Sequence, residues 1–200
     1  MRVTVETFTP NPVDVCSSFA GLCYGKQDSS SKRLERCYKS GHLGIFEHAS
    51  VSFLIEGISR ACSHQIVRHR VASFNQVSQR YCKMAEDYDA VTPPSIEAHG
   101  MGEAYELCAL ACVATYHNML EAGVPAEDAR YILPQGGTTA LVVTMNLREL
   151  FHFLDLRTDW HAQWEIRKVA YAMLEAVSWI DAQYGEIMGL WKAEHPTNVA

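Results

Sequence analysis

The sequence predicts an α+β fold: a single domain over residues 1–200, with a central, mostly antiparallel or mixed sheet flanked by long helices. Three segments are rich in β-branched or alternating apolar residues, which is typical of strands. Several long helical segments do not alternate regularly with these strands, so a doubly wound parallel sheet is disfavoured. With 48% apolar residues and no linker-like tract, the chain can bury one sizeable core.

The first elements follow from alternation and turn residues. Residues 1–8, MRVTVETF, alternate apolar and polar side chains and predict an opening strand. Residues 10–25 begin with turn residues and continue as a short helix. After the solvated DSSS stretch, residues 32–41 predict a second helix, which Gly41 closes.

The next elements bring the chain to its most basic segment. A loop is expected at residues 42–48, and the alternation in residues 49–59 predicts a half-buried strand. Ser59 is a suitable N-cap for a helix over residues 60–69. On such a helix the side chains of Gln65, Arg68 and His69 would share one face.

The middle of the chain is predicted to be mostly helical. Residues 82–100 are expected to form a loop, because two consecutive prolines interrupt them. Residues 101–123 predict a long amphipathic helix that ends at a glycine. Residues 124–134 have proline and acidic residues at their start and predict a short helix that displays Arg130.

The last third combines one strand with further helices. The apolar, β-branched run TTALVVTMN predicts a strand over residues 138–146. It leads into a helix over residues 147–157. Residues 161–188 predict one last long helix.

Charge and composition exclude several classes of function. The formal net charge of -6 argues against a broad nucleic-acid or anionic-membrane surface, because those partners require extended positive fields. The N-terminus lacks an apolar signal region, so a cytoplasmic location is expected. Seven cysteines without a CxxC pair favour reduced thiols. A metal pair at Cys108 and Cys112 is conceivable, but buried core residues are expected there and no metal is predicted.

The segment RHRVASFNQVSQRY, residues 68–81, is unusual in this acidic chain. It holds three arginines and one histidine but no acidic residue, and its serines, asparagine and glutamines can hydrogen-bond a polar ring. Arginine presents a rigid fork of donors that fits phosphate oxygens. The segment therefore predicts a site for anionic, ring-bearing ligands.

The same segment resembles the RHRxxSxNxxSxRY signature of the flavin-dependent thymidylate synthases, with every fixed position matched. The stretch GHLGIFEH is similar to the GHxxxFEH element of that family, and ARYILP resembles its arginine-bearing helix end. MNLRELFHFLDLRTDWHAQWEIR is similar to the C-terminal part of the family's site. Together these stretches cover most of the chain between residues 41 and 167.

The resemblance implies methylation of dUMP to dTMP, with FAD as cofactor, NADPH as reductant and methylenetetrahydrofolate as carbon donor. It implies an α+β chain that works as a homotetramer, with sites at subunit interfaces. It also implies a set of residues that bind FAD: His42, Glu47, Arg68, His69, Arg70, Asn75, Gln76, Asn146, Arg148, His152 and Leu156.

The residues that the resemblance implies for dUMP are Gln65, Arg68, Gln76, Ser78, Gln79, Arg80, Arg130 and Arg157. Two of them are expected to be catalytic. Arg157 would stabilise negative charge that develops on the uracil ring, and Ser78 would position and polarise it. The chain departs from the family at Gly44, where a hydroxyl is common, and at His152, where an amide is common.

The sequence also bears on four alternatives to this interpretation. Ser78 could act as a nucleophile, but no neighbouring residue in the sequence would obviously deprotonate it. No cysteine lies in the basic segment, which disfavours a thiolate mechanism. The nine histidines lack the HxxxH or HExxH spacing of a metallohydrolase. A non-catalytic nucleotide-binding relative is a further alternative, which the intact Ser78, Arg80 and Arg157 disfavour.

Overall fold

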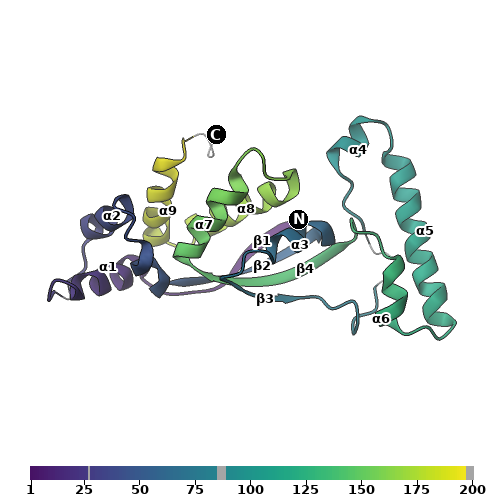
Figure 1. The fold of residues 1–200 in the computed structure, drawn as a ribbon, viewed down its shortest axis with the longest axis horizontal. Helices are drawn as coiled ribbons and strands as arrows, with labels where there is room; N and C mark the ends of the chain where they lie inside the picture. Colours follow the sequence, from purple (N-terminus) through teal and green to yellow (C-terminus); the bar gives the residue numbers. More distant parts are fainter. Residues whose placement is uncertain (27, 85–88, 197–200) are drawn as a thin grey trace. The chain divides into compact units, whose positions relative to one another are not determined.

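A computed structural model describes residues 1–26, 28–84 and 89–196 and shows a mixed α and β fold. Its sheet has four strands in the order β1-β2-β4-β3 (Figure 1). The strands are β1 (Arg2–Phe8), β2 (Ser50–Ser59), β3 (Ser73–Gln76) and β4 (Thr138–Asn146). The predicted combination of strands and long helices is confirmed.

The chain divides into two compact units that both draw on distant parts of the sequence. The first unit comprises Met1, Glu56–Arg68 and Asn75–Leu141, and the second comprises Arg2–Ile55, His69–Phe74 and Val142–Ala200. The segment of residues 68–81 therefore contributes to both units. The prediction that the chain forms one domain stays a prediction.

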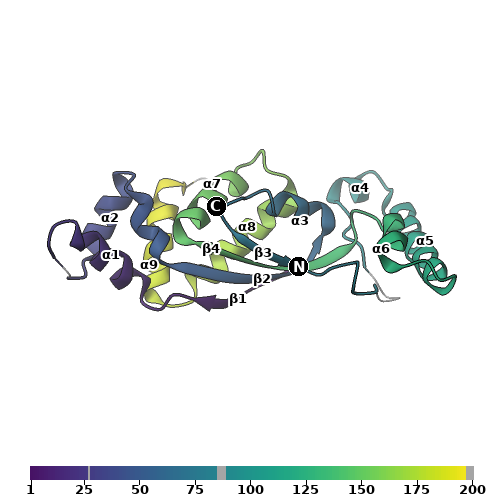
Figure 2. The ribbon, with the colours of Figure 1, turned by 60° about the horizontal axis from the view of Figure 1, so that its bottom comes forward.

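The second unit packs helices against strand residues. Its elements besides strand segments are α1 (Pro12–Leu22), α2 (Ser31–Lys39), the 3-10 helix η1 (Leu43–His48), α7 (Leu147–Thr158), α8 (Trp164–Ser178) and α9 (Ala182–Glu194). Helix α8 packs against β1 and α7, and α1 packs against α2, η1 and α9 (Figures 1 and 2). This arrangement builds a core from both ends of the chain.

The core of the second unit confirms the alternation read in the sequence. Val51, Phe53 and Ile55 of β2 are buried, while the residues between them are partly exposed. Phe153 of α7 and Trp191 of α9 are fully buried as well. One face of β2 is therefore buried in the apolar core of this unit.

Side chains of α9 tie the last helix to the first elements. The Tyr184 hydroxyl donates a hydrogen bond to the Thr9 carbonyl at 2.9 Å. Gln183 accepts one from the Val13 backbone at 2.9 Å. Burial raises the pKa of the Tyr184 hydroxyl, so it stays a neutral donor. The N-terminal segment thus depends on residues near the C-terminus for its packing.

The first unit contains a separate group of helices: α3 (Arg60–Ile66), α4 (Pro94–Ala98), α5 (Gly102–Glu121), α6 (Ala126–Ala129) and the 3-10 helix η2 (Arg130–Ile132). The expected cap is present, because Ser59 Oγ accepts from the Cys62 backbone at 3.0 Å. The glycine stop of α5 is confirmed at Gly123, which has a φ of 89° that favours glycine. Helix α5 packs on α6 and η2.

Several elements differ from the sequence predictions. Helix α3 ends at Ile66, so Arg68 and His69 do not share a helix face with Gln65. The predicted loop at 42–48 contains η1, and the predicted loop at 82–100 contains α4. Residues 85–88 of that second loop lie outside the described residues.

The last predicted helix is two helices. It breaks after Ser178 because Asp181 is extended and caps α9, with its Oδ1 accepting from the Tyr184 backbone at 2.9 Å. Strand β3 lies inside the basic segment, where the polar sequence SFNQ carries little strand signal. Its following residue pairs with β4, since the Val77 backbone donates to the Ala140 carbonyl at 3.0 Å.

Over the described ranges 1–26, 28–84 and 89–196, no helix is long and apolar enough to cross a membrane. All seven cysteines are free thiols. Cys16 and Cys62 are buried, and burial raises the pKa of the Cys16 thiol to about 12. Cys108 is exposed rather than part of the core, which corrects the sequence prediction for this residue.

Candidate functional site

The basic segment serves two surfaces, because its residues belong to both units. Arg68 and residues 75–81 belong to the first unit, whereas residues 69–74 belong to the second.

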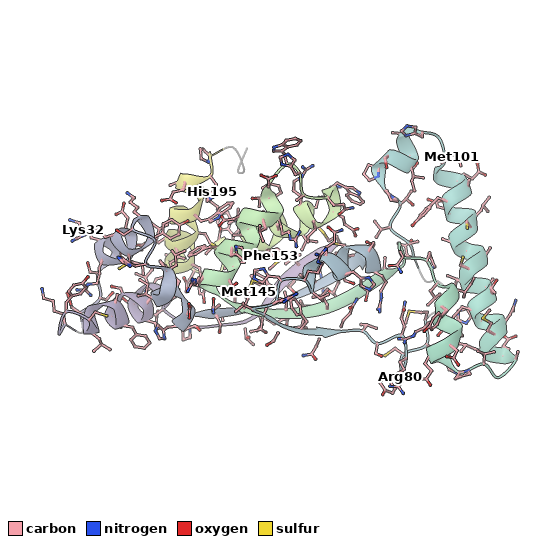
Figure 3. The ribbon with its side chains drawn as sticks, viewed as in Figure 1. Lys32, Arg80, Met101, Met145, Phe153 and His195 are labelled. Atoms are coloured by element: carbon pink, nitrogen blue, oxygen red, sulfur yellow. The ribbon has the colours of Figure 1, made fainter. Side chains whose placement is uncertain are left out.

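In the first unit a tight turn presents Arg80. Ser78 starts this turn: its Oγ accepts from the Arg80 backbone at 3.2 Å, and its carbonyl accepts from the Cys82 backbone at 2.9 Å. The Arg80 guanidinium lies 5.4 Å from the centre of the Tyr81 ring (Figure 3). Its Nε donates to Glu127 Oε2 at 2.5 Å. An acid from α6, of the kind that the segment itself lacks, thus engages one edge of the Arg80 guanidinium.

A pocket of about 380 Å³ in the same unit brings together two predicted dUMP residues, Gln79 and Arg130. Its lining residues are Arg60, His64, Gln79, Arg130, Tyr131, Leu133, Pro134 and Gln135. The Arg130 Nε donates to the Glu127 carbonyl at 3.0 Å, which fixes the direction of its guanidinium. With two arginines and two amides, the pocket can hold a phosphate and a polar ring.

The sequence interpretation missed Arg60 and His64, which also line this pocket. Both lie on α3, and their spacing of four residues on a helix capped by Ser59 places them on one face. The spacing of four residues could have identified Arg60 and His64 as neighbours from the sequence alone. The Arg60 Nη1 donates to the Val77 carbonyl at 3.1 Å, so α3 is tied to the chain that follows β3.

Gln76 has structural partners in the first unit. Its Nε2 donates to Ser63 Oγ at 2.8 Å and to Thr139 Oγ1 at 3.2 Å. Gln65 is half-buried on α3, and Asn75 is exposed on β3. Arg68 is exposed in the turn after α3. The pocket residues and the Ser78 turn therefore form the better-defined part of this surface.

In the second unit a buried histidine lies at the centre of the predicted flavin residues. His69 is 6% exposed, and its Nε2 lies 3.2 Å from Glu149 Oε2. The rings of His69 and His152 are 5.4 Å apart, and the edge of Phe153 closes another side at 5.6 Å. Sequence reasoning missed Glu149, although it sits three residues before His152 on the same face of α7.

The surroundings of His69 favour its neutral form. Burial is the main cause that lowers its pKa, the Glu149 carboxylate opposes this, and electrostatic interaction with His152 and Arg157 lowers the pKa further. Arg157 is therefore close enough to act on this group electrostatically. A neutral imidazole whose Nε2 faces the Glu149 carboxylate carries its proton on that nitrogen, which leaves Nδ1 as an acceptor for a polar ligand.

This burial predicts a pH dependence of stability. Since the unfolded chain takes up the proton at a higher pH than the folded chain, stability is full above about pH 6.5 and is lost as the pH falls below it. We expect the melting temperature of His69→Gln to fall less between about pH 7.5 and 5 than that of the wild type. Calorimetry checks this.

The exposed His161, which contacts Asp159 at 2.8 Å, provides the control. The variant His161→Gln should keep the steeper dependence of the wild type. Equal slopes for His69→Gln and the wild type would contradict the assignment.

Other predicted flavin residues of the second unit lie at the surface. Arg148 forms an ion pair with Glu47, which joins α7 to η1. Asn146 caps α7, with its Oδ1 accepting from the Glu149 backbone at 2.9 Å. The remaining predicted flavin residues are exposed: His42, Arg70, His152 and Leu156.

The donor set suits a large anionic cofactor with a polar ring. Exposed arginines at 70 and 148 can contact phosphates, and Nδ1 of a neutral His69 can accept a hydrogen bond from a ring N–H. Over residues 1–26, 28–84 and 89–196 no group of three or more metal-ligating side chains occurs. These features define a class of α+β proteins whose donor sets suit nucleotide-like anions.

Comparisons with known proteins define this class further. The family model described as "Thymidylate synthase complementing protein" matches residues 4–180. A flavin-dependent thymidylate synthase of Geobacter sulfurreducens is 42% identical over 190 residues, covering 88% of this chain and 82% of the relative. One from Pyrococcus furiosus is 41% identical over 193 residues, covering 89% and 79%. One from Sulfurisphaera tokodaii is 50% identical over 138 residues, covering 68% and 53%.

The chain therefore belongs to the family of flavin-dependent thymidylate synthases. The expectation drawn from the signature in residues 68–81 is confirmed at the level of the family.

Proposed function

We propose that this protein is a flavin-dependent thymidylate synthase. It methylates dUMP to dTMP with methylenetetrahydrofolate as the carbon donor and NADPH as the reductant, and it holds FAD. Relatives with this name align with 88% and 89% of the chain. The structural observation that carries the proposal is the pocket in which Gln79 and Arg130, far apart in the sequence, lie together with Arg60.

The residues of the first unit bind and orient dUMP. Arg130 and Arg80 present guanidinium groups that suit a phosphate dianion, and Gln79 offers an amide to the ring. Ser78 accepts a hydrogen bond from the backbone and keeps its own proton to donate to the pyrimidine. Each residue thus fixes the substrate without forming a covalent bond to it.

The residues of the second unit hold the cofactor. When bound, FAD supplies the redox chemistry, because it takes reducing equivalents from NADPH and provides them for the new methyl group. Arg70 and Arg148 would meet its phosphates, and His69 its ring system. Arg157 would place its guanidinium on a uracil carbonyl and stabilise charge that develops there.

Two measurements test the proposed function. The purified protein should bind FAD, which is seen as the visible absorption bands of a flavoprotein. It should also release tritium from dUMP labelled at C5 when NADPH and methylenetetrahydrofolate are added. FAD binding without tritium release would instead support a non-catalytic nucleotide-binding role.

Ser78 offers a prediction that separates positioning from covalent catalysis. We expect Ser78→Ala to lower kcat by about 10- to 100-fold, since one hydrogen bond to the reacting ring is lost. Steady-state assays of dTMP formation measure this. A complete loss of turnover with unchanged dUMP binding would contradict the assignment and favour a nucleophilic serine.

We also propose that this chain has the family's fold, forms a homotetramer with sites between subunits, and is located in the cytoplasm. Large apolar side chains exposed on α5 support assembly, with Leu107 at 60% and Leu110 at 58% exposure. Light scattering after size-exclusion chromatography should give four times the mass of the 22.4 kDa chain. A monomer at micromolar concentration would contradict this.

A further inference from the structure

A second basic pocket lies in the second unit and involves none of the predicted site residues. It measures about 380 Å³, and its lining residues are Tyr24, Lys26, Ser30, Arg33, Arg36 and Cys37. Three of these residues are cations and none is a carboxylate. Residues 24–39 hold five cations and two acids in a chain of net charge -6, so this is a second local concentration of positive charge.

The backbone around Gly21 builds one wall of this pocket. The Gly21 carbonyl accepts from the backbones of Tyr24 and Lys26, at 2.9 and 3.0 Å, which folds the chain back on the end of α1. A Cβ at Gly21 would lie 2.5 Å from the Lys26 carbonyl oxygen and 2.8 Å from Arg33 Nη1. Only glycine therefore allows this close approach, which brings Lys26 and Arg33 to the same pocket.

Arg33 is held rigidly. Its Nη1 donates to the Ser17 carbonyl at 3.0 Å and to the Asp28 carbonyl at 2.7 Å, and its Nη2 donates to Asp28 Oδ1 at 2.8 Å. The side chain is 17% exposed. Its hydrogen bond is the main reason why the pKa of Asp28 is low, so that carboxylate offsets part of the Arg33 charge.

Lys26 and Arg36 supply the exposed positive charge of the pocket, although Asp28 interacts electrostatically with Lys26 as well as with Arg33. Both Lys26 and Arg36 are exposed, and within the described part of the chain neither forms an ion pair with an acidic side chain. Tyr24 is 74% exposed and offers a free aromatic face beside them. An arginine fork, an ammonium group and an aromatic ring together match a phosphate attached to a nucleotide.

The pocket is joined to the predicted flavin side by a short connection. Helix α2, which carries Arg33 and Arg36, ends at Lys39, and the His42 backbone donates to the Cys37 carbonyl at 2.8 Å. His42 precedes η1, which carries Glu47. A ligand held in this pocket would therefore be bound on the element that leads directly into the predicted cofactor residues.

We propose that this pocket binds the phosphate on the adenosine ribose of NADPH, with the adenine against Tyr24. The assignment rests on the proposed function, in which NADPH is the reductant. It makes Lys26 and Arg36 the residues that distinguish NADPH from NADH, because only NADPH carries the additional dianion. Removing a charged partner from a phosphate weakens binding by at least about tenfold.

Direct binding provides the first test. Calorimetry with adenosine 2′,5′-bisphosphate is carried out on protein saturated with FAD and dUMP, so that those sites are occupied. The double variant Lys26→Gln, Arg36→Gln should bind at least about tenfold more weakly than wild type. Adenosine 5′-monophosphate should bind weakly to both proteins.

Lys32→Gln is the matched control. Lys32 lies on the same helix, does not line the pocket and projects from α2 at the surface (Figure 3). It should bind the bisphosphate as wild type does. Equal weakening in Lys32→Gln, or unchanged binding in the double variant, would overturn the proposal.

Kinetics provide the second test and separate the two proposals. The double variant should raise the KM for NADPH at least about tenfold and leave the KM for NADH and the FAD content unchanged. If dTMP forms and the KM for NADPH does not change, the pocket assignment fails while the proposed function stands. If the double variant raises only the KM for polyglutamylated folate, the pocket serves the folate and the proposal is overturned.

The same experiments also recognise failure of the proposed function alone. If the double variant loses the bisphosphate but wild-type protein makes no dTMP, the pocket assignment stands and the proposed function fails.

Discussion

Replacing Arg157 by lysine is expected to lower kcat by about 100- to 1000-fold, which is typical for the loss of a donor aimed at developing charge. Arg157 lies in the last turn of α7, where it acts electrostatically on His69. Lysine keeps the charge but lacks the planar fork that a uracil carbonyl would meet. Single-turnover formation of dTMP measures the effect, with FAD absorbance recorded beside it.

The control for this variant is Arg167→Lys. The Arg167 Nη1 donates to the Trp160 carbonyl at 2.9 Å, and the residue is not among the predicted site residues. Its kcat should change less than about twofold. Unchanged kcat in Arg157→Lys would remove Arg157 from the catalytic assignment.

Replacing Arg80 by alanine is expected to raise the Kd for dUMP by about 10- to 100-fold, equivalent to roughly 1.5–3 kcal/mol. The reason is the loss of a guanidinium that the Ser78 turn holds in position. Flavin spectra should stay unchanged. Equilibrium binding of dUMP to the FAD-loaded protein measures the effect.

Glu127→Gln is the informative companion variant, because Glu127 accepts from Arg80 Nε at 2.5 Å. It removes the competing negative charge and keeps the arginine, so dUMP should bind as tightly as in wild type or more tightly. If Arg80→Ala loses FAD while keeping its affinity for dUMP, the assignment of Arg80 to the substrate is wrong.

The sequence predicted the elements with strong local signals. Alternation located the strands at 1–8 and 49–59, and the β-branched, apolar run located the strand at 138–146. It did not locate β3, because SFNQ is short and polar and is held by pairing with β4 rather than by its own propensity. Helix α3 ends at Ile66 without any glycine or proline to mark the end.

The candidate site was predicted in its residue types but not in its arrangement. The family resemblance suggested Gln79 and Arg130 for the substrate, and both line one pocket. Arg60 and Glu149 were missed because their importance depends on neighbours that the fold brings from elsewhere. The division of residues 68–81 between two units has no local signal in the sequence.

The hydrogen bonds from α9 to the first elements affect how the chain folds during synthesis. The second unit needs Arg2–Ile55 and Val142–Ala200 to meet, and the hydrogen bond from Tyr184 to Thr9 spans nearly the whole sequence. Contacts of such long range form late and slow folding, because the intervening chain must first be closed into a loop. During synthesis, the apolar side chains of Val51, Phe53 and Ile55 therefore emerge long before the helices that cover them.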